Sequence, residues 1–451
     1  MTRKTLKLLP YQEEGVQFLK SRARALLADD MGLGKTIQAI AYINSLAKMH
    51  DILIVCPAVM RGTWLNELRA WLDKPYGIVR LETTYLPLMH KPCVYVLSYD
   101  SIRNPRVLAY LKKRSFAIAV CDESHYMKNR EAKRTQAVLA SGLKSSRWVF
   151  MSGTPVTKSP TDLWPILAAA APECLGVYKS YNEFYHRYCK MYIDDNGRER
   201  VAGAQNLDEL RARLQPFMLR RTKTEVLKDL PDIFHQAVMI SPTKKIKDLL
   251  KQEHEAERSL RLKDIMLGSP GEAWRKALQE NDAHMMTIRR ELGEEKLVHI
   301  LEAVDNILCQ TNKLVIFCHH QELVKYIEAS LQKDGISYVT LTGKTPYEQR
   351  QDAITRFQSD PNCQVFIGAI SVSIGITLTA AHHILFAEVS FLPHEMEQAA
   401  ARCHRLGQRK NVLVQYLLWE DSLEHWIFSN VLFKAETVHQ IVNKKDEDHD
   451  E

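Results

Sequence analysis

The fold of this chain is decided by one stretch, Leu26-Leu27-Ala28-Asp29-Asp30-Met31-Gly32-Leu33-Gly34-Lys35-Thr36. A short apolar run leads into a turn with two glycines, and the Gly-Lys-Thr that follows opens a helical pattern with Ile37, Ile40 and Ala41 on one face. Glycine lets a backbone wrap closely around an anion, and the N–H groups at a helix start point towards it. Lys35 can reach the outer phosphates of a nucleotide, and the Thr36 hydroxyl can bind Mg²⁺. The stretch therefore predicts a phosphate-binding loop between a strand and a helix.

The match to the strict pattern G-x-x-x-x-G-K-[ST] is incomplete, because that pattern needs glycine at position 29 and this chain has Asp29. The structural alternative is a strand–turn–helix junction with a fortuitous Gly-Lys-Thr. Motifs elsewhere in the chain decide between the two.

The composition is that of an ordinary globular protein. The chain has 451 residues, of which 45% are hydrophobic and 25% charged, and this length predicts about two or three domains. No apolar run approaches the ~18 residues of a membrane span, and the basic N-terminus lacks the apolar segment of a secretory signal. We therefore expect a protein that works in a cytoplasm without a membrane partner.

Cysteine usage and net charge say little about the function of the chain. The nine cysteines have no CxxC spacing, and Cys56, Cys121 and Cys318 lie in apolar runs, so they are interpreted as reduced core residues rather than zinc ligands. The net charge of +7 permits a polyanionic partner without demonstrating one.

Short β-type runs alternate with helical stretches up to about residue 170 and again after about residue 296. Near-continuous apolar strands between helices indicate parallel sheets that are covered on both faces. Between these parts lie two long polar helical segments, 243–262 and 272–292, separated by Gly268–Gly271. We therefore predict an α/β protein with a first lobe over residues 1–215, a linker and helical protrusion over 216–295, a second lobe over 296–435 and a charged tail over 436–451.

An acidic motif, Asp122-Glu123-Ser124-His125, directly follows the apolar run 116–121. Loops at the carboxyl ends of parallel strands are where such folds bind ligands. A carboxylate there can bind Mg²⁺, and a second one beside it can orient or deprotonate an attacking water. We assign Asp122 to the metal and Glu123 to the water; the structural alternative is a solvated strand end.

Ser152-Gly153-Thr154-Pro155 follows another apolar strand. Small hydroxyl residues at a strand end can relay between a nucleotide site and a neighbouring surface. An ordinary turn that ends the strand explains the segment equally well.

Residues 398–408, Gln-Ala-Ala-Ala-Arg-Cys-His-Arg-Leu-Gly-Gln, read as a helix that runs into a glycine turn. Gln398, Arg402 and Arg405 are spaced i, i+4 and i+7, which predicts that they share one helix face. Arginine suits phosphate, and a guanidinium from a second lobe can stabilise the charge that develops in phosphoryl transfer. The alternative is an ordinary solvated face.

Taken together, these motifs resemble those of the Swi/Snf-type ATPases of helicase superfamily two, over most of residues 6–430. In the first lobe the resemblance covers Leu9–Val16, Leu27–Gln38, Ile54–Pro57 with Trp64, Asp122–His125 and Ser152–Pro155. In the second lobe it covers Lys313–His319, Leu341–Gly343 with Arg350, Ser371–Thr379 and Gln398–Gln408. An acidic residue at position 29 is usual in this family, so the departure from the strict phosphate loop supports the resemblance. The segment 371–378 has one glycine where many members have more.

The resemblance implies two RecA-like lobes that close on ATP and Mg²⁺. It also implies that the inter-lobe helices around 243–292 form a protrusion that braces the lobes; a simple spacer is the alternative. Gln12 is the implied adenine reader. The implied nucleotide-binding residues are Gln12, Asp29, Met31, Gly32, Gly34, Lys35 and Thr36, with Thr36 and Asp122 at the metal. The implied catalytic residues are Lys35, Glu123, Arg402 and Arg405, the two arginines being contributed by the second lobe.

The resemblance further implies a DNA-dependent ATPase that translocates on or remodels duplex, forked or junction DNA. Phe386–Glu388 and Arg402–Gln408 look closest to the annealing-helicase branch, which remodels stalled forks and reanneals strands. A strand-separating helicase on DNA or RNA, a displacer of DNA-bound proteins and a nucleotide-gated binding subunit remain as alternatives. The chain has little sequence outside these motifs, so we expect a minimal bacterial or viral motor that works as a monomer in a bacterial cell or bacterial host.

Overall fold

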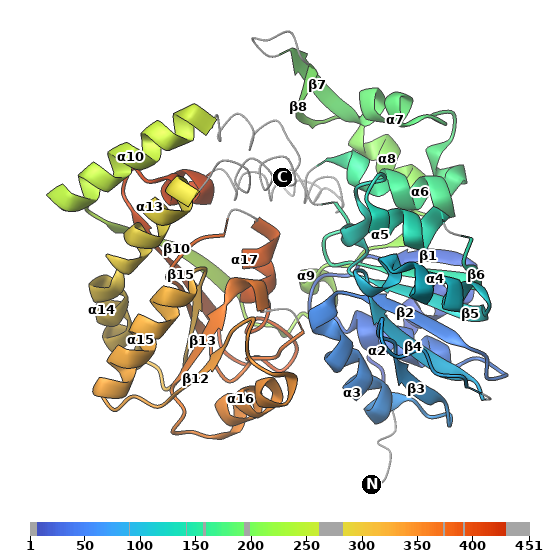
Figure 1. The fold of residues 1–451 in the computed structure, drawn as a ribbon, viewed down its shortest axis with the longest axis horizontal. Coiled ribbons are helices and arrows are strands. Elements are labelled where there is room, and N and C mark those ends of the chain that lie inside the picture. Colours follow the sequence, from blue (N-terminus) through green and yellow to red (C-terminus); the bar gives the residue numbers. More distant parts are fainter. Residues whose placement is uncertain are drawn as a thin grey trace, which may run out of the picture. The chain divides into compact units, whose positions relative to one another are not determined.

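The computed structural model describes residues 7–89, 91–140, 142–156, 159–193, 199–260, 283–372, 375–390 and 393–429. These residues form two compact units. The first runs to Met191 and includes Gly203–Lys228, and the second contains Tyr192–Ala202 and the residues from Asp229 onward. Each unit is built on a parallel β-sheet (Figure 1). The predicted α/β class with two parallel-sheet lobes is therefore confirmed.

The first unit contains a seven-stranded sheet in the order β3-β4-β2-β5-β6-β1-β9, in which every pair is parallel. Parallel neighbours need a long crossover, usually a helix, and a helix follows most of these strands. The strands are β1 (Arg24–Leu27), β2 (Ile52–Cys56), β3 (Gly77–Arg80), β4 (Cys93–Ser98), β5 (Ser115–Asp122), β6 (Lys144–Met151) and β9 (Met218–Leu219).

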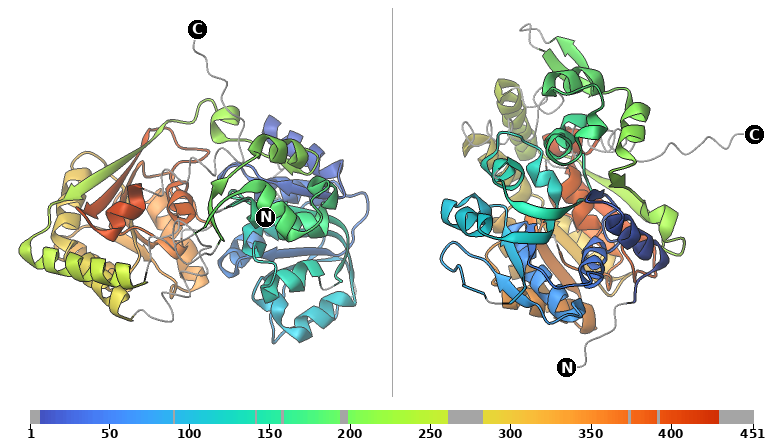
Figure 2. Two further views of the ribbon diagram at one scale, coloured as in Figure 1. Left: turned by 90° about the horizontal axis from the view of Figure 1, so that it is seen from above. Right: turned by 90° about the vertical axis from the view of Figure 1, so that its right-hand side faces the viewer.

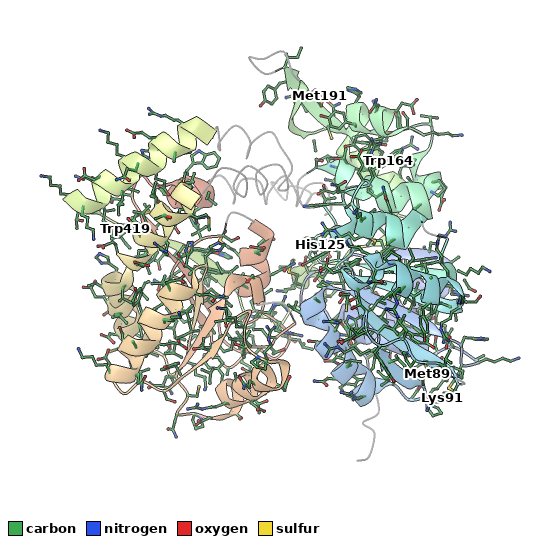
Figure 3. The ribbon with its side chains drawn as sticks, in the orientation of Figure 1. Met89, Lys91, His125, Trp164, Met191 and Trp419 are labelled. Carbon is green, nitrogen blue, oxygen red and sulfur yellow. The ribbon has the colours of Figure 1, made fainter. Side chains whose placement is uncertain are left out.

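Both faces of this sheet are covered, which explains why its central strands are apolar at consecutive positions. All five residues of β2 are buried. One face packs on the helices α4 (Pro105–Lys112), α6 (Trp164–Ala170), α7 (Tyr181–Tyr188) and α8 (Leu207–Leu214). On the other side, the buried residues of α1 (Pro10–Lys20), α2 (Lys35–Asn44) and α3 (Arg61–Trp71) form part of the core. Figure 3 marks Trp164 of α6, which belongs to the first of these faces.

The second unit contains a six-stranded parallel sheet in the order β10-β15-β14-β11-β13-β12. Its strands are β10 (Ile233–Ile240), β11 (Leu314–Cys318), β12 (Tyr338–Leu341), β13 (Val365–Ala369), β14 (His383–Phe386) and β15 (Val412–Trp419). One face packs on α10 (Lys244–Leu260), α13 (Ala283–Glu294), α14 (Leu297–Leu308) and α15 (Gln321–Lys333). The other face packs on α16 (Tyr347–Ser359) and α17 (Pro393–Ala400).

The segment 216–295, which the sequence predicts as a linker and helical protrusion, also contributes strands. The two-residue β9 joins the edge of the first sheet, and β10 forms an edge of the second. The helix α9 (Lys223–Val226) lies between them in the chain. The two predicted long helices correspond in part to α10 and α13; residues 261–282, with the Gly268–Gly271 turn, and the predicted tail 436–451 lie outside the described residues.

A two-stranded hairpin of β7 (Cys189–Ile193) and β8 (Glu199–Ala204) follows α7 and leads into α8 (Figures 1 and 2). Within the part of the chain that the structure describes, no helix is long and apolar enough to cross a membrane.

Candidate active site

Four neighbouring strands of the first sheet end in a single row. In the pairing register Asp122 of β5 lies beside Met151 of β6, Met151 lies beside Leu27 of β1, and Leu27 lies beside Leu219 of β9. The carboxyl ends of parallel strands are the edge at which open α/β sheets bind ligands. The predicted phosphate loop and the two predicted strand-end motifs, after β1, β5 and β6, therefore meet at one edge.

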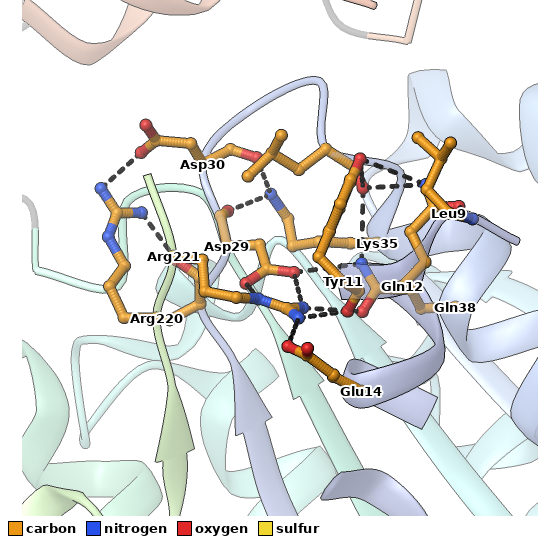
Figure 4. A network of polar contacts seen from close by, with 12 residues as sticks. Leu9, Tyr11, Gln12, Glu14, Asp29, Asp30, Lys35, Gln38, Arg220 and Arg221 are labelled. Carbon is orange, nitrogen blue, oxygen red and sulfur yellow. Dashed lines mark hydrogen bonds and ion pairs between the residues drawn. The ribbon is translucent and has the colours of Figure 1, made fainter. Parts of the chain in front are cut away.

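The phosphate loop lies between β1 and α2. Its turn requires glycine, because Gly32 and Gly34 have φ values of 90° and 76°, and Gly34 is the residue at which α2 begins. The Lys35 ammonium donates to the backbone carbonyls of Asp29 (2.7 Å) and Asp30 (3.2 Å) (Figure 4). Burial lowers the pKa of Lys35, and the nearby carboxylates of Glu123 and Asp29 oppose that effect. The loop thus holds the Lys35 ammonium against two of its own backbone carbonyls.

The loop is closed from one side by the segment after β6. A Cβ atom at Gly153 would lie 2.5 Å from Cγ of Met31 and 3.3 Å from Nζ of Lys35. Only glycine permits this approach, because real Cβ atoms essentially never come within 3.0 Å of a heavy atom. The predicted motif 152–155 is therefore in contact with the phosphate loop.

Gln12, the predicted adenine reader, is buried at the start of α1. Its amide nitrogen donates to the carbonyl of Leu33 (3.2 Å) and to the Tyr11 hydroxyl (3.3 Å), and its oxygen accepts from the backbone of Leu9 (3.0 Å). The same nitrogen would lie 2.6 Å from a Cβ at Gly34. Gln12 therefore lies against the glycine that starts α2, next to the phosphate loop.

Asp29 was expected among the nucleotide-binding residues, and its side chain has a different set of contacts. The carboxylate is fully buried; it accepts from Arg221 Nε (3.0 Å) and Nη2 (2.6 Å) and from the Gln38 amide (3.0 Å) (Figure 4). Asp29 reaches Lys35 through its backbone carbonyl instead. Its direct contribution to the loop is thus through the backbone, while its carboxylate anchors the loop to Arg221.

Asp122 is held in a fixed orientation at the end of β5. The indole nitrogen of Trp64 donates to one carboxylate oxygen (2.8 Å), and the Glu123 backbone N–H donates to the other (3.0 Å). Burial, followed by the neighbouring charge of Glu123, raises the pKa of Asp122 to about 6, although Trp64 and Lys35 act in the opposite direction. The raised pKa shows that burial disfavours the ionised form of this carboxyl, and a bound cation would stabilise that form.

The donor set fits Mg²⁺. Magnesium prefers oxygen ligands and is usually bound by one or two carboxylates together with substrate phosphates and waters. Asp122 and Thr36 provide a carboxylate and a hydroxyl. Over the described ranges, no group of three or more His, Cys, Asp or Glu residues could hold a metal ion. A magnesium ion at this site would therefore need phosphate and water ligands as well.

Glu123 adopts a left-handed backbone conformation, with φ of 48°, which is uncommon for a residue other than glycine and is typical of functional turns. Its carboxylate lies 3.3 Å from Nδ1 of His125, and that nitrogen lies 3.0 Å from the Ser152 hydroxyl. The Ser152 oxygen also accepts from the backbone N–H of Thr154 (3.1 Å). Figure 3 marks the position of His125. A continuous set of polar contacts therefore links the acidic motif to the segment after β6.

In the second unit, the segment 398–408 differs from the prediction. The helix α17 ends at Ala400, and residues 401–407 form turns, so Gln398, Arg402 and Arg405 do not share one face of a continuous helix. The turns form because this segment bonds to the loop after β13: Leu378 N–H donates to the Arg402 carbonyl (2.9 Å).

The side chains of these turns bond to the same loop. Arg405 donates to the Thr377 hydroxyl (2.8 Å), and the Gln408 amide donates to the carbonyl of Ala381 (2.8 Å). Arg402 is buried and donates to the carbonyl of Gln398 (2.9 Å). Residues 373 and 374, in the middle of the predicted motif 371–379, lie outside the described residues.

The sequence analysis missed two residues of the site, Arg220 and Arg221, which follow β9. Arg220 donates to the carbonyls of Ala28 (2.6 Å) and Gly153 (3.0 Å), and its guanidinium pairs with Asp30 at 2.5 Å. The available signal was the short apolar run 217–219 followed by two arginines. A two-residue strand is too short for a periodicity argument to detect.

Comparison with known proteins identifies the family. The chain matches the SNF2-related domain over residues 11–313 and the helicase conserved C-terminal domain over residues 296–407. The chain belongs to the SNF2-related family. The matched regions contain the phosphate loop and residues 398–407 of the 398–408 segment, so the resemblance inferred from the motifs is confirmed at the level of the family.

Several curated relatives align with almost the whole chain. The mouse protein "DNA annealing helicase and endonuclease ZRANB3" is 30% identical over 98% of this chain, and the alignment covers 41% of the mouse protein. The homologue of "SWI/SNF-related matrix-associated actin-dependent regulator of chromatin subfamily A-like protein 1" from Caenorhabditis elegans is 31% identical over 96% of this chain and 62% of its own length. The chain thus spans about two fifths to three fifths of these relatives. A solved structure, the Sulfolobus solfataricus SWI2/SNF2 ATPase core in complex with dsDNA, is 24% identical, with a TM-score of 0.46 and 97% of both chains covered.

Proposed function

We propose that this SNF2-related chain is an ATP-hydrolysing motor that acts on duplex or forked DNA. The observation that carries the proposal is the row of strand ends in the first sheet, which brings Lys35, the acidic motif with Asp122 and Glu123, and the Ser152 segment to one edge. This arrangement suits a nucleoside triphosphate, because phosphoryl transfer depends on positioning and on electrostatic stabilisation of the transferred group.

In the proposed site Lys35 leaves its two backbone acceptors and pairs with the outer phosphates. Thr36 and Asp122 hold Mg²⁺, which, when bound, neutralises charge on the phosphate oxygens. Glu123 orients and deprotonates the attacking water, and His125 fixes the Glu123 carboxylate through the 3.3 Å contact. Gln12 reads the adenine. In the second unit, Arg402 and Arg405 supply the guanidinium groups that stabilise the developing charge.

The proposal that DNA is the activating ligand is supported by the relatives. The name of the mouse relative describes a DNA annealing helicase. We propose strand annealing and the remodelling of forks or junctions as the activity, in keeping with the annealing-helicase resemblance of residues 386–388.

The first test is a phosphate-release assay with ATP and Mg²⁺ over a panel of fork, junction, duplex and single-stranded DNAs and an RNA. We expect the largest stimulation with fork or duplex DNA. Preferential stimulation by RNA or single strands would favour the strand-separating alternative, and the absence of nucleotide hydrolysis under every condition would refute the motor.

The second test separates the roles of the cradle and the arginines. Lys35→Ala is expected to abolish hydrolysis, because the positive charge in the loop is lost. Arg405→Ala is expected to retain nucleotide affinity within about threefold while hydrolysis falls at least ~10³-fold, which is the scale of an arginine that acts in the transition state. Arg106→Ala, on the exposed side of α4, is the matched control. Equal loss of binding and hydrolysis in Arg405→Ala would contradict the assigned role.

A further inference from the structure

The phosphate loop of this chain carries two adjacent carboxylates, Asp29 and Asp30, which we term the acidic pair. Both are within the eleven-residue stretch that has to receive a highly charged polyphosphate. Carboxylates close to phosphate oxygens repel them, and the repulsion is strong where water is excluded. Carboxylates in a loop with this sequence therefore weaken nucleotide binding unless their charges are neutralised.

Two consecutive arginines provide that neutralisation. Arg221 forms a two-point contact with the fully buried Asp29 carboxylate, at 3.0 and 2.6 Å. Arg220 pairs with Asp30 at 2.5 Å. The paired fork geometry is the strong form of the arginine–carboxylate interaction. We term Arg220 and Arg221 the arginine pair; each of its members neutralises one member of the acidic pair (Figure 4).

The arginine pair is also bonded to the backbone around the loop. Arg220 donates to the carbonyl of Ala28 at 2.6 Å, and Arg221 donates to the carbonyl of Tyr11. These contacts bridge 192 and 210 positions of sequence. The two arginines reach the loop because β9 pairs with β1, so that residues 220 and 221 emerge beside residues 28 and 29. The guanidinium groups are thus fixed on both the acid and the backbone side.

We propose that Arg220 and Arg221 are positioning residues that make the acid-bearing loop competent to bind a nucleoside triphosphate, by neutralising Asp30 and Asp29 respectively. The proposal rests on the proposed function, because it takes ATP as the ligand of the loop. It assigns a role to residues outside the strict phosphate-loop pattern and explains how Asp29 can replace the glycine of that pattern. Neither arginine needs to touch the nucleotide.

A purely structural role of the arginine pair makes a different prediction. If the arginines only stabilised the fold, replacing a carboxylate as well would remove one more buried contact, and neither the stability of the protein nor its nucleotide affinity would recover. If they neutralise charge, replacing the matching aspartate by asparagine should restore nucleotide affinity. The restoration should follow the pairing, so Asp30→Asn should rescue Arg220 variants and Asp29→Asn should not.

The experiment uses the full chain and the fluorescent nucleotides mant-ATP and mant-ADP with Mg²⁺. Arg220→Gln is expected to weaken mant-ATP binding about tenfold, as expected for loss of one charge-assisted contact, and mant-ADP binding less, because ADP carries fewer negative charges. Arg220→Lys, which keeps the charge, and the double variant Arg220→Gln/Asp30→Asn are both expected within about threefold of the wild type. The cross pair Arg220→Gln/Asp29→Asn is expected to stay at least as weak as Arg220→Gln. A melting curve of every variant checks that it is folded.

Arg221→Gln with and without Asp29→Asn is the corresponding second series. Because Asp29 is fully buried, Arg221→Gln alone could fail to fold, and the partly exposed Arg220–Asp30 pair then carries the test. Wild-type mant-ATP affinity in a folded Arg220→Gln, or no recovery on adding Asp30→Asn, would overturn the inference alone. Absence of mant-ATP binding by the wild-type chain would overturn the proposed function and this inference with it.

Discussion

Gly15 is a buried residue of α1. For its replacement by alanine, helix propensity predicts a gain in stability, whereas the tertiary structure predicts a loss. Replacing glycine by alanine inside a helix normally stabilises the helix by about 1 kcal/mol. In this chain a Cβ at Gly15 would lie 1.8 Å from Oε1 of Gln38 and 2.9 Å from Nη2 of Arg221. Neither distance is compatible with the present positions of those atoms.

The cost of Gly15→Ala follows from the contacts of Gln38. Its Oε1 accepts from Arg221 at 3.1 Å, and its amide nitrogen donates to Asp29 at 3.0 Å. Gln38 is fully buried, so its amide cannot move into solvent without leaving these partners. Hydrogen bonds to charged groups contribute about 1.5–3 kcal/mol each. Set against the helical gain of about 1 kcal/mol, the loss of both bonds at the lower end of this range, about 1.5–2 kcal/mol each, predicts a net destabilisation of about 2–3 kcal/mol.

Thermal melting followed by circular dichroism measures the effect. For a domain of this size about 1 kcal/mol shifts Tm by roughly 2–4 °C, so Gly15→Ala is expected to lower the Tm of the first unit by about 4–12 °C. Gly203→Ala is the matched control, since its Cβ would meet no atom within 4 Å. An unchanged or higher Tm in Gly15→Ala would show that Gln38 relaxes freely, and would refute the rigid network around Asp29.

Two further predictions concern Gly153, which contacts the phosphate loop, and Glu388 in the second unit. Gly153→Ala places its Cβ against Met31 and 3.3 Å from Lys35 Nζ, so kcat/KM for ATP in a phosphate-release assay should fall about tenfold with Tm little changed; wild-type kinetics would contradict the contact. Burial alone would raise the pKa of Glu388, but hydrogen bonds from His320 lower it from 4.5 to about 2. Since the folded pKa lies below the unfolded one, the ionised carboxylate contributes about 3 kcal/mol above pH ~4.5, which is lost as the pH falls towards 2. In urea unfolding, Glu388→Gln should therefore be less stable than the wild type at pH 7 and should approach it at pH 3; a pH-independent difference would contradict this assignment.

Much of the fold could be predicted from local pattern, because parallel strands covered on both faces are apolar at consecutive positions. The apolar run that contains Cys56 corresponds to β2, and the apolar run 116–121 lies within β5. The phosphate loop could be predicted for a similar reason, since its glycine conformations and helix start are encoded within a few residues. The acidic motif follows a strand and therefore had to lie at a carboxyl edge.

The predictions that differ from the structure depend on contacts between distant segments. The helix expected to continue through Arg402 ends at Ala400, because the backbone of the following turn bonds to Leu378. The strand β9 was missed inside the predicted linker, because two residues carry no periodic signal and their partner, β1, lies far away in the sequence. The sequence also did not indicate that Arg221, 192 positions away, binds the Asp29 carboxylate.

By itself, the sequence determined that Lys35 follows a glycine turn at the start of a helix, and that two carboxylates follow a buried strand. Only the tertiary structure decided the order of the strands in the sheet. That order is set by packing and by pairing over long sequence separations, which no local pattern encodes. It places β9 beside β1, and with it Arg220 and Arg221 beside the phosphate loop. The sequence shows the two carboxylates of Asp29 and Asp30, but only the folded sheet brings Arg220 and Arg221 close enough to neutralise them.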